Sequence, residues 1–83
     1  MPEPYYPCPC CGYLTLPESP PGTYENCDVC FWEDDTVQFD HPDYEGGANQ
    51  VSLEQARANF QAFDVSELRF KLDVRPPRPD EQP

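Results

Sequence analysis

Three of the five cysteines lie within four consecutive positions near the start of the chain: Cys8, Cys10 and Cys11. With Cys27 and Cys30 they give the pattern C-x2-C-x15-C-x2-C, a spacing typical of four-cysteine zinc sites. Two residues between ligands allow a tight turn that points both thiolates at one ion in tetrahedral geometry. The sequence therefore predicts one structural Zn²⁺ bound by Cys8, Cys11, Cys27 and Cys30.

Two other uses of paired cysteines fit this chain less well. An exported disulfide framework usually has an even number of cysteines behind a signal peptide, whereas this chain has five and begins MPEPYYPCP. A redox C-x-x-C pair needs a lowered thiol pKa, but both pairs have acidic surroundings and neither precedes a helical pattern. We therefore expect a reduced, cytoplasmic protein, without a membrane span of about 18 apolar residues.

The fifth cysteine, Cys10, lies between two predicted ligands and cannot join the same ion without straining the turn. Free cysteines are often packed as small apolar residues, which predicts a partly buried bystander. The alternative is a spare ligand or an oxidation-sensitive thiol.

A chain of 83 residues has room for one domain. A core of this size rarely supplies more than about 3–5 kcal/mol, whereas a structural zinc site is worth an apparent value of about 10–16 kcal/mol. We therefore expect the metal to stabilise this fold more than its core does. The domain is expected at 1–75 and an extended, proline-rich tail at 76–83.

The expected fold is a small α+β module, in which a zinc-ribbon-like β-hairpin carries two cysteine knuckles. Strand-forming residues at 13–16 and 23–24 flank a turn at 17–22, so they are predicted to pair. The other expected segments are an extended lead-in at 1–7, a third strand at 31–33 and an irregular loop at 40–50.

One amphipathic helix is indicated at 53–63. Ser52 is a suitable N-cap and Gln55 follows three residues later, which predicts a capping box. Apolar residues at 53, 56, 60 and 63 form one helical stripe. Beyond the helix, apolar alternation at 68–74 favours a strand, although a last helical turn also fits. The residues expected in the core are Leu14, Tyr24, Trp32, Leu53, Phe60 and Phe63.

Four stretches of the chain, CPCCGYLTL, YENCDVCFWEDD, GGANQVSLEQARANF and VRPPRPDE, together resemble the cysteine-rich CPCC family of small, mostly bacterial proteins. The resemblance extends from about Tyr6 to Glu81. It implies a zinc-ribbon-like head with a C-terminal helix and assigns the ligand roles to Cys8, Cys11, Cys27 and Cys30, but it implies no particular activity. A second ribbon knuckle commonly ends in glycine, whereas Phe31 follows Cys30 here.

Charge is distributed very unevenly along the chain. Residues 1–56 contain eleven acids and no Lys or Arg, whereas residues 57–83 contain five acids and all five bases. The net charge of −11 disfavours nucleic acids and anionic membranes, because phosphate binding requires a basic patch. A basic protein is therefore the expected partner. The sequence does not indicate an oligomeric state.

The stretch FWEDDTVQFDHPDYEGG combines aromatic and acidic residues after the second cysteine pair. One interpretation places its aromatic residues in the core and its acids on a solvated rim. A second is a hard-cation site, although the spacing of an EF-hand is absent. A third is a partner-binding face, whose expected residues are Trp32, Glu33, Asp34, Asp35, Asp40 and Asp43.

These observations favour a non-catalytic interaction module, which we expect to act like an immunity protein or antitoxin that inhibits a basic partner such as a nuclease. Four cysteines would close the zinc site, whereas a catalytic zinc keeps an open position. His41 is the only histidine, and a chain this small provides little cleft for acid–base catalysis. The alternative is a small thiol- or metal-dependent enzyme or redox protein that uses Cys10.

Overall fold

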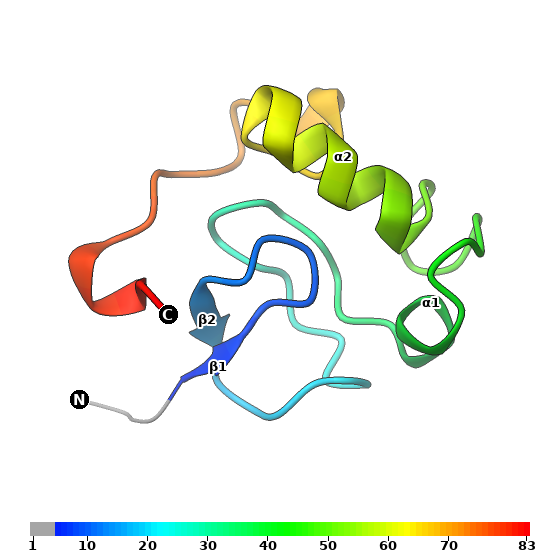
Figure 1. The fold of residues 1–83 in the computed structure, drawn as a ribbon, viewed down its shortest axis with the longest axis horizontal. Helices are drawn as coiled ribbons and strands as arrows, with labels where there is room; N and C mark the ends of the chain where they lie inside the picture. Colours follow the sequence, from blue (N-terminus) through cyan, green and yellow to red (C-terminus); the bar gives the residue numbers. More distant parts are fainter. Residues whose placement is uncertain (1–4) are drawn as a thin grey trace.

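The computed structural model describes residues 5–83, with little regular secondary structure arranged around a cluster of cysteines (Figure 1). The expected small α+β class is confirmed, with one two-stranded antiparallel sheet and a C-terminal helix. The elements in chain order are β1 (Tyr6–Pro7), β2 (Leu14–Leu16), α1 (Thr36–Asp40), α2 (Leu53–Phe63) and the 3₁₀ turns η1 (Leu68–Phe70) and η2 (Pro79–Glu81).

The β-hairpin forms around the first cysteine pair and not between the two pairs. Strand β2 confirms the predicted strand character of Leu14–Leu16, but it pairs with β1, with Tyr6 opposite Leu16. The predicted pairing with 23–24 is therefore wrong: Tyr24 is exposed and has a φ of 58°. The predicted third strand at 31–33 is reduced to one bridge between Asn26 and Glu33. The first four residues of the expected lead-in lie outside the described residues.

Helix α2 has the predicted bounds, Leu53–Phe63. Its N-cap is Ser52, whose hydroxyl accepts a hydrogen bond from the Gln55 backbone N–H at 3.1 Å. The reciprocal half of the capping box is absent, because the Gln55 side chain donates to Asn59 at 2.8 Å. The helix ends where Asp64 takes a left-handed φ of 65°.

A short helix, α1, occupies a segment for which the sequence analysis predicted no helix. The Asp35 carboxylate caps it by accepting a hydrogen bond from the Gln38 N–H at 3.0 Å. The fully buried Gln38 amide in turn donates to the carbonyls of Asn49 and Val51 at 3.0 and 3.1 Å. The expected irregular loop at 40–50 is therefore held in place from within by polar side chains.

The C-terminal part of the chain folds back over the rest. Residues 68–70 form η1, so the favoured strand at 68–74 is wrong. In the expected tail, Pro79–Glu81 forms η2 and Glu81 is buried, so the tail is neither extended along its whole length nor fully solvated. The division into a domain at 1–75 and a tail at 76–83 stays a prediction.

The core surrounds the cysteines. Of the expected core residues, Trp32 and Leu53 are buried, and Leu14 and Phe60 are half-buried. Tyr24 and Phe63 are 57% and 40% exposed, so their assignment to the core was wrong. Leu16 and Val65 are buried instead. Among residues 5–83, no helix combines the length and the apolar character needed to cross a membrane.

Candidate metal centre

The sulfur atoms of Cys8, Cys11, Cys27 and Cys30 all lie within 4.8 Å of one another. Two of the pairs, Cys8 with Cys30 and Cys11 with Cys27, are separated by 3.6 Å, far longer than a disulfide bond of about 2.05 Å. A zinc ion with tetrahedral Zn–S bonds of about 2.3 Å would require sulfurs about 3.8 Å apart. The four side chains are therefore compatible with one shared metal ion.

The two cysteine knuckles, residues 8–12 and 27–31, have the same backbone hydrogen bonds. In the first knuckle, the Cys8 N–H donates to Tyr13 O at 2.9 Å, and the Gly12 N–H donates to Cys8 O at 2.8 Å. In the second, the Cys27 N–H donates to Trp32 O at 2.9 Å, and the Phe31 N–H donates to Cys27 O at 2.8 Å. The same local structure therefore turns the two sulfurs of each knuckle toward the other knuckle.

The residue after each second cysteine has a left-handed backbone. Gly12 has a φ of 83° and Phe31 a φ of 68°, so the phenylalanine adopts the conformation for which glycine is usually selected. The Phe31 ring packs against the Phe70 ring, with 4.5 Å between the ring centroids. The departure from the glycine pattern therefore leaves the knuckle geometry intact, and the Phe31 side chain contacts η1.

Cys10 occupies the position in the first knuckle that Val29 occupies in the second. The Cys10 N–H donates to Cys8 Sγ at 3.4 Å, and the Val29 N–H donates to Cys27 Sγ at 3.4 Å. Both residues are buried, and Cys10 is outside the group of four sulfurs. The prediction that Cys10 does not belong to the cluster agrees with this placement.

Cys27 has one more hydrogen-bond donor than Cys8. The Thr15 hydroxyl, from β2, donates to Cys27 Sγ at 3.0 Å. The position equivalent to Thr15 in the second half is Asp34, whose carboxylate accepts a hydrogen bond from the Thr23 N–H at 2.9 Å. The sulfurs of the two knuckles therefore have different polar surroundings despite their common backbone.

The four thiols, packed this closely, shift one another's pKa. The pKa of Cys27 is lowered, because its thiolate accepts hydrogen bonds from the sulfurs of Cys11, Cys30 and Cys8 and from Thr15, against the effect of burial. The pKa of Cys8 is raised chiefly by its contact with Cys11, and the pKa of Cys11 by its contact with Cys27. Contact with Cys10 is the main cause that raises the pKa of Cys30. Burial raises the pKa of all three thiols. A divalent cation would replace the remaining thiol protons, since metal ligands must be deprotonated.

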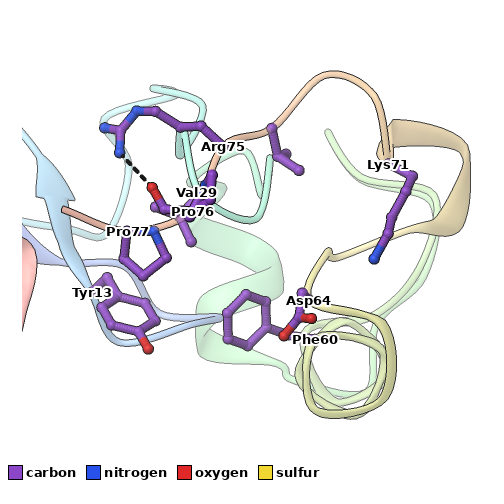
Figure 2. Close-up of a pocket in the computed structure, with 9 residues that line it drawn as sticks. Tyr13, Val29, Phe60, Asp64, Lys71, Arg75, Pro76 and Pro77 are labelled. Carbon is purple, nitrogen blue, oxygen red and sulfur yellow. Dashed lines mark hydrogen bonds between the residues drawn. The ribbon is translucent and has the colours of Figure 1, made fainter.

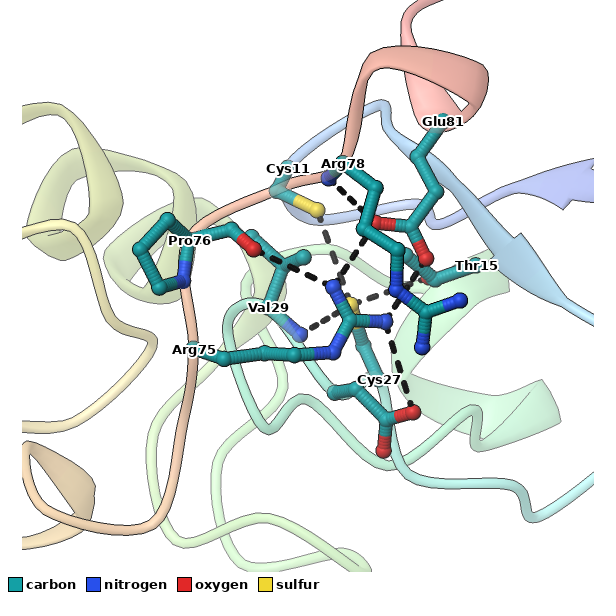
Figure 3. A network of polar contacts seen from close by, with 9 residues as sticks. Cys11, Thr15, Cys27, Val29, Arg75, Pro76, Arg78 and Glu81 are labelled. Carbon is teal, nitrogen blue, oxygen red and sulfur yellow. Dashed lines mark hydrogen bonds and ion pairs between the residues drawn. The ribbon is translucent and has the colours of Figure 1, made fainter.

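An arginine from the C-terminal segment lies against the second knuckle (Figure 3). Arg75 donates two hydrogen bonds to the Glu81 carboxylate, at 2.8 and 2.7 Å, and its guanidinium is 3.6 Å from Asp28. The hydrogen bond to Glu81 is the main cause that raises the pKa of Arg75. Burial lowers this pKa, and the negative charges of Asp28 and Cys27 raise it further. The same pairing lowers the pKa of Glu81.

The residues expected to bind a partner do not form one surface. Trp32, Asp34 and Asp35 are buried, so the expectation that they contact a partner is corrected. Asp35 caps α1 and accepts a second hydrogen bond from the Ala48 N–H at 2.9 Å; although burial opposes it, these N–H donors lower its pKa. Glu33 is half-buried, and Asp40 and Asp43 are exposed.

A pocket of about 450 Å³ lies beside the cysteine knuckles. Figure 2 shows the Tyr13 and Phe60 rings in the lower part of the view and Val29 beside Pro76 in the upper part. The Tyr13 and Phe60 rings meet edge to face, with 6.2 Å between their centroids. The pocket therefore separates the C-terminal segment from α2.

Sequence reasoning missed three residues that contact the centre or its surroundings: Thr15, Arg75 and Glu81. Thr15 gave no signal, because a threonine in a predicted strand is ordinary. Arg75 and Glu81 are the ends of the stretch RPPRPDE, which belongs to the family resemblance but was interpreted, from residue 76 on, as an extended tail. Two opposite charges in a proline-rich stretch were the signal that could have found them.

The model of a family described as Cysteine-rich CPCC matches residues 6–81, which is nearly the whole chain. This match confirms the resemblance seen in the sequence, including its first and last residues. None of the curated proteins matches the chain.

Proposed function

The chain belongs to the cysteine-rich CPCC family, and we propose that its four clustered cysteines bind one structural Zn²⁺ in a small module that recognises a basic protein. The observation that carries the zinc assignment is the approach of four sulfurs to within 4.8 Å. Tetrahedral sulfur sites of this kind hold zinc or iron. The ligands would be Cys8, Cys11, Cys27 and Cys30.

The energetic role of the metal supports this proposal. Outside the cysteines, only a few large apolar side chains among residues 5–83 are fully buried, including Trp32, Leu16 and Leu53. An ion bound by four thiolates would supply an apparent value of about 10–16 kcal/mol, more than so small a core provides. The fold would therefore depend on the ion.

Elemental analysis of purified, reduced protein tests the metal and its identity together. We expect one zinc per chain, and loss of the circular dichroism spectrum of the folded protein when a strong chelator removes it. If the protein instead contained one iron per chain and had a visible absorption band, the proposed metal would be iron. Protein that is folded without a stoichiometric transition metal would exclude it.

We also propose that the centre is not catalytic. Four thiolates would fill the four positions of a tetrahedral zinc, whereas a catalytic zinc keeps one for water or substrate. The burial of Cys10, and its equivalence to Val29, support a packing role for this thiol over a nucleophilic one.

The proposed partner is a basic protein, in the manner of an immunity protein or antitoxin that binds a nuclease. Its support is the charge distribution, with eleven acids and no base in residues 1–56. With Trp32, Asp34 and Asp35 buried, the proposed face consists of Asp40 and Asp43 together with exposed apolar side chains around α1. These apolar side chains are Val37, Phe39 and Tyr44.

Capture from a lysate of the native host, with matched variants as bait, tests this face. We expect wild-type protein to retain a basic protein at moderate salt, and a variant with Asp40→Lys and Asp43→Lys to lose it. The control carries Glu18→Lys and Glu25→Lys, which make the same change of charge at exposed positions outside the stretch 31–45. Equal capture by both variants would exclude the proposed face, and capture of no basic protein would exclude the proposed partner.

A further inference from the structure

The C-terminal segment 74–81, here called the strap, crosses the second knuckle on its way to β2. The Arg75 backbone N–H donates to the carbonyl of Asp28 at 3.1 Å, and Asp28 lies between Cys27 and Val29. Figure 1 shows this segment, in orange and red, running from the side of α2 toward the strands. At its end, η2 contacts β2.

One partly buried ion pair within the strap fixes its shape. The Arg75 guanidinium binds both carboxylate oxygens of Glu81, at 2.8 and 2.7 Å, and a bidentate pair fixes the direction of the arginine. The Glu81 carboxylate also accepts a hydrogen bond from the Arg78 N–H at 2.8 Å. Although Glu81 is near the end of the chain, it is only 7% exposed.

Apolar packing contributes less to the attachment of the strap. The pocket of about 450 Å³ lies between Val74–Pro77 and the side chains of Tyr13 and Phe60. A segment that stands over a pocket is held by its ends and its polar contacts. The Arg75–Glu81 pair therefore fixes the shape of the strap, and the bond from the Arg75 N–H to Asp28 O attaches that shape to the second knuckle.

The charge of Arg75 suits a metal centre of this composition. Four thiolates carry more negative charge than one divalent ion carries positive charge, so the assembled centre is anionic and favours a fixed cation nearby. Resting on the proposed zinc site, we propose that Arg75 is a positioning residue, held by Glu81 and Asp28, that closes the second knuckle and slows release of the metal. Partners of metal ligands typically change metal affinity 10–100-fold, to order of magnitude.

The first knuckle offers a matched control. Arg57 donates to the carbonyl of Pro9 at 2.9 Å, and Pro9 is the position equivalent to Asp28. Among residues 5–83, the exposed Arg57 side chain makes this one hydrogen bond and has no carboxylate partner. Arg57→Gln therefore removes the same charge from the other knuckle without releasing the strap.

The test measures transfer of zinc from the loaded, full-length protein to excess 4-(2-pyridylazo)resorcinol, followed by absorbance. We expect Arg75→Gln to release zinc about tenfold faster than wild type, and Arg57→Gln to release it at the wild-type rate. Equal rates for the two variants, with one zinc bound to each, would overturn the inference alone. Wild-type protein without stoichiometric metal would overturn the proposed zinc site and this inference with it.

A second variant separates the strap from charge alone and remains informative if Arg75→Gln does not fold. Glu81→Gln removes a negative charge near an anionic centre, so electrostatics alone would slow zinc release. Loss of the bidentate pair would instead loosen the shape of the strap over the second knuckle and speed release. We expect faster release, and an unchanged or slower rate would overturn the proposed role of the strap.

Discussion

The two cysteine knuckles have the same backbone and different surroundings. Each uses an N–H donated to its first cysteine sulfur, at Cys10 and Val29, and a left-handed residue at its end, Gly12 or Phe31. The repeated backbone is what two thiolates of one turn need in order to face one ion. The side chains at these positions differ between the two knuckles, whereas the backbone hydrogen bonds are the same.

The two knuckles differ in how far along the chain the residues that contact them lie. The first is enclosed by its own hairpin, β1 with β2. The second has one local bridge, Asn26 with Glu33, and depends on contacts from afar: the Ser66 N–H donates to Cys30 O at 2.8 Å and the Arg75 N–H donates to Asp28 O at 3.1 Å. The first knuckle is thus enclosed by its own hairpin, with one distant side chain, Arg57, on Pro9 O. The second also receives backbone hydrogen bonds from distant segments.

Replacing a ligand breaks both knuckles at once and has the largest expected effect. Cys27→Ser and Cys8→Ser each put a weakly acidic hydroxyl where a thiolate is needed. We expect either variant to lose the metal and the fold, since the ion supplies an apparent value of about 10–16 kcal/mol. Elemental analysis and circular dichroism measure the two losses. A folded variant with one zinc would show that the altered residue is not a ligand.

Thr15 distinguishes the two first cysteines, and its removal has the next largest effect. Thr15→Val keeps the shape of the side chain and deletes the hydroxyl that donates to Cys27 Sγ at 3.0 Å. A hydrogen bond to a charged group is worth about 1.5–3 kcal/mol, so zinc affinity is expected to fall by about tenfold or more. Competition with a chelator measures this change. Thr15→Ser should recover most of the affinity, and equal affinity for the valine and serine variants would contradict the hydrogen bond.

The features predictable from the sequence are those with local causes. The spacing of Cys8, Cys11, Cys27 and Cys30 identified the four sulfurs that meet. Ser52 and the apolar stripe identified both ends of α2, because a cap and a helical period are written into neighbouring residues. The strand at Leu14–Leu16 was found for the same reason.

The features that were missed depend on which segments and side chains meet in the folded chain. The pairing of β2 with Tyr6–Pro7 follows from the closure of the first knuckle and not from the turn at 17–22. Helix α1 is stabilised by Asp35 and by the buried amide of Gln38, which binds a loop more than ten residues away. The acids of the stretch 31–45 look alike in the sequence, yet Asp34 and Asp35 bind backbone N–H groups and Asp43 faces solvent.

Substitutions of the left-handed residue that ends each knuckle have smaller expected effects on stability. One substitution adds backbone strain, and the other removes it. A Cβ built on Gly12 meets nothing within 4 Å, so Gly12→Ala costs only the backbone strain, about 1–2 kcal/mol. Phe31→Gly removes that strain, but it also loses the apolar area that the ring buries and the contact with the Phe70 ring, worth about 0.5–1.5 kcal/mol beyond that area. We expect the relief of strain to offset only part of this loss. Urea unfolding at saturating zinc measures both.

Phe31→Ala is the control for this pair, because it loses the ring and keeps the strain. We expect it to be less stable than Phe31→Gly by about 1–2 kcal/mol. If Phe31→Ala were as stable as Phe31→Gly, the left-handed backbone at this position would carry no cost, and the two knuckles would differ in more than their side chains.

The smallest expected effect tests the equivalence of Cys10 and Val29. Cys10→Val gives the first knuckle the residue that the second already has, in a backbone with the same N–H to sulfur bond. We expect one zinc per chain and a free energy of unfolding within about 1 kcal/mol of wild type, as for other small changes of buried apolar volume. Elemental analysis and urea unfolding at saturating zinc are the measurements.

This variant also separates the roles of the three neighbouring sulfurs, because Cys11→Ser in the same turn should lose the metal. A packing residue can be replaced by another of similar size, whereas a ligand or a reactive thiol cannot. Retention of zinc by Cys10→Val together with its loss from Cys11→Ser would therefore assign Cys10 to the core. The control is Val29→Ala, a change at the equivalent position, which should leave the fold intact. If Cys10→Val lost its zinc while Val29→Ala stayed folded, Cys10 would be part of the metal centre, and the two knuckles would not be equivalent.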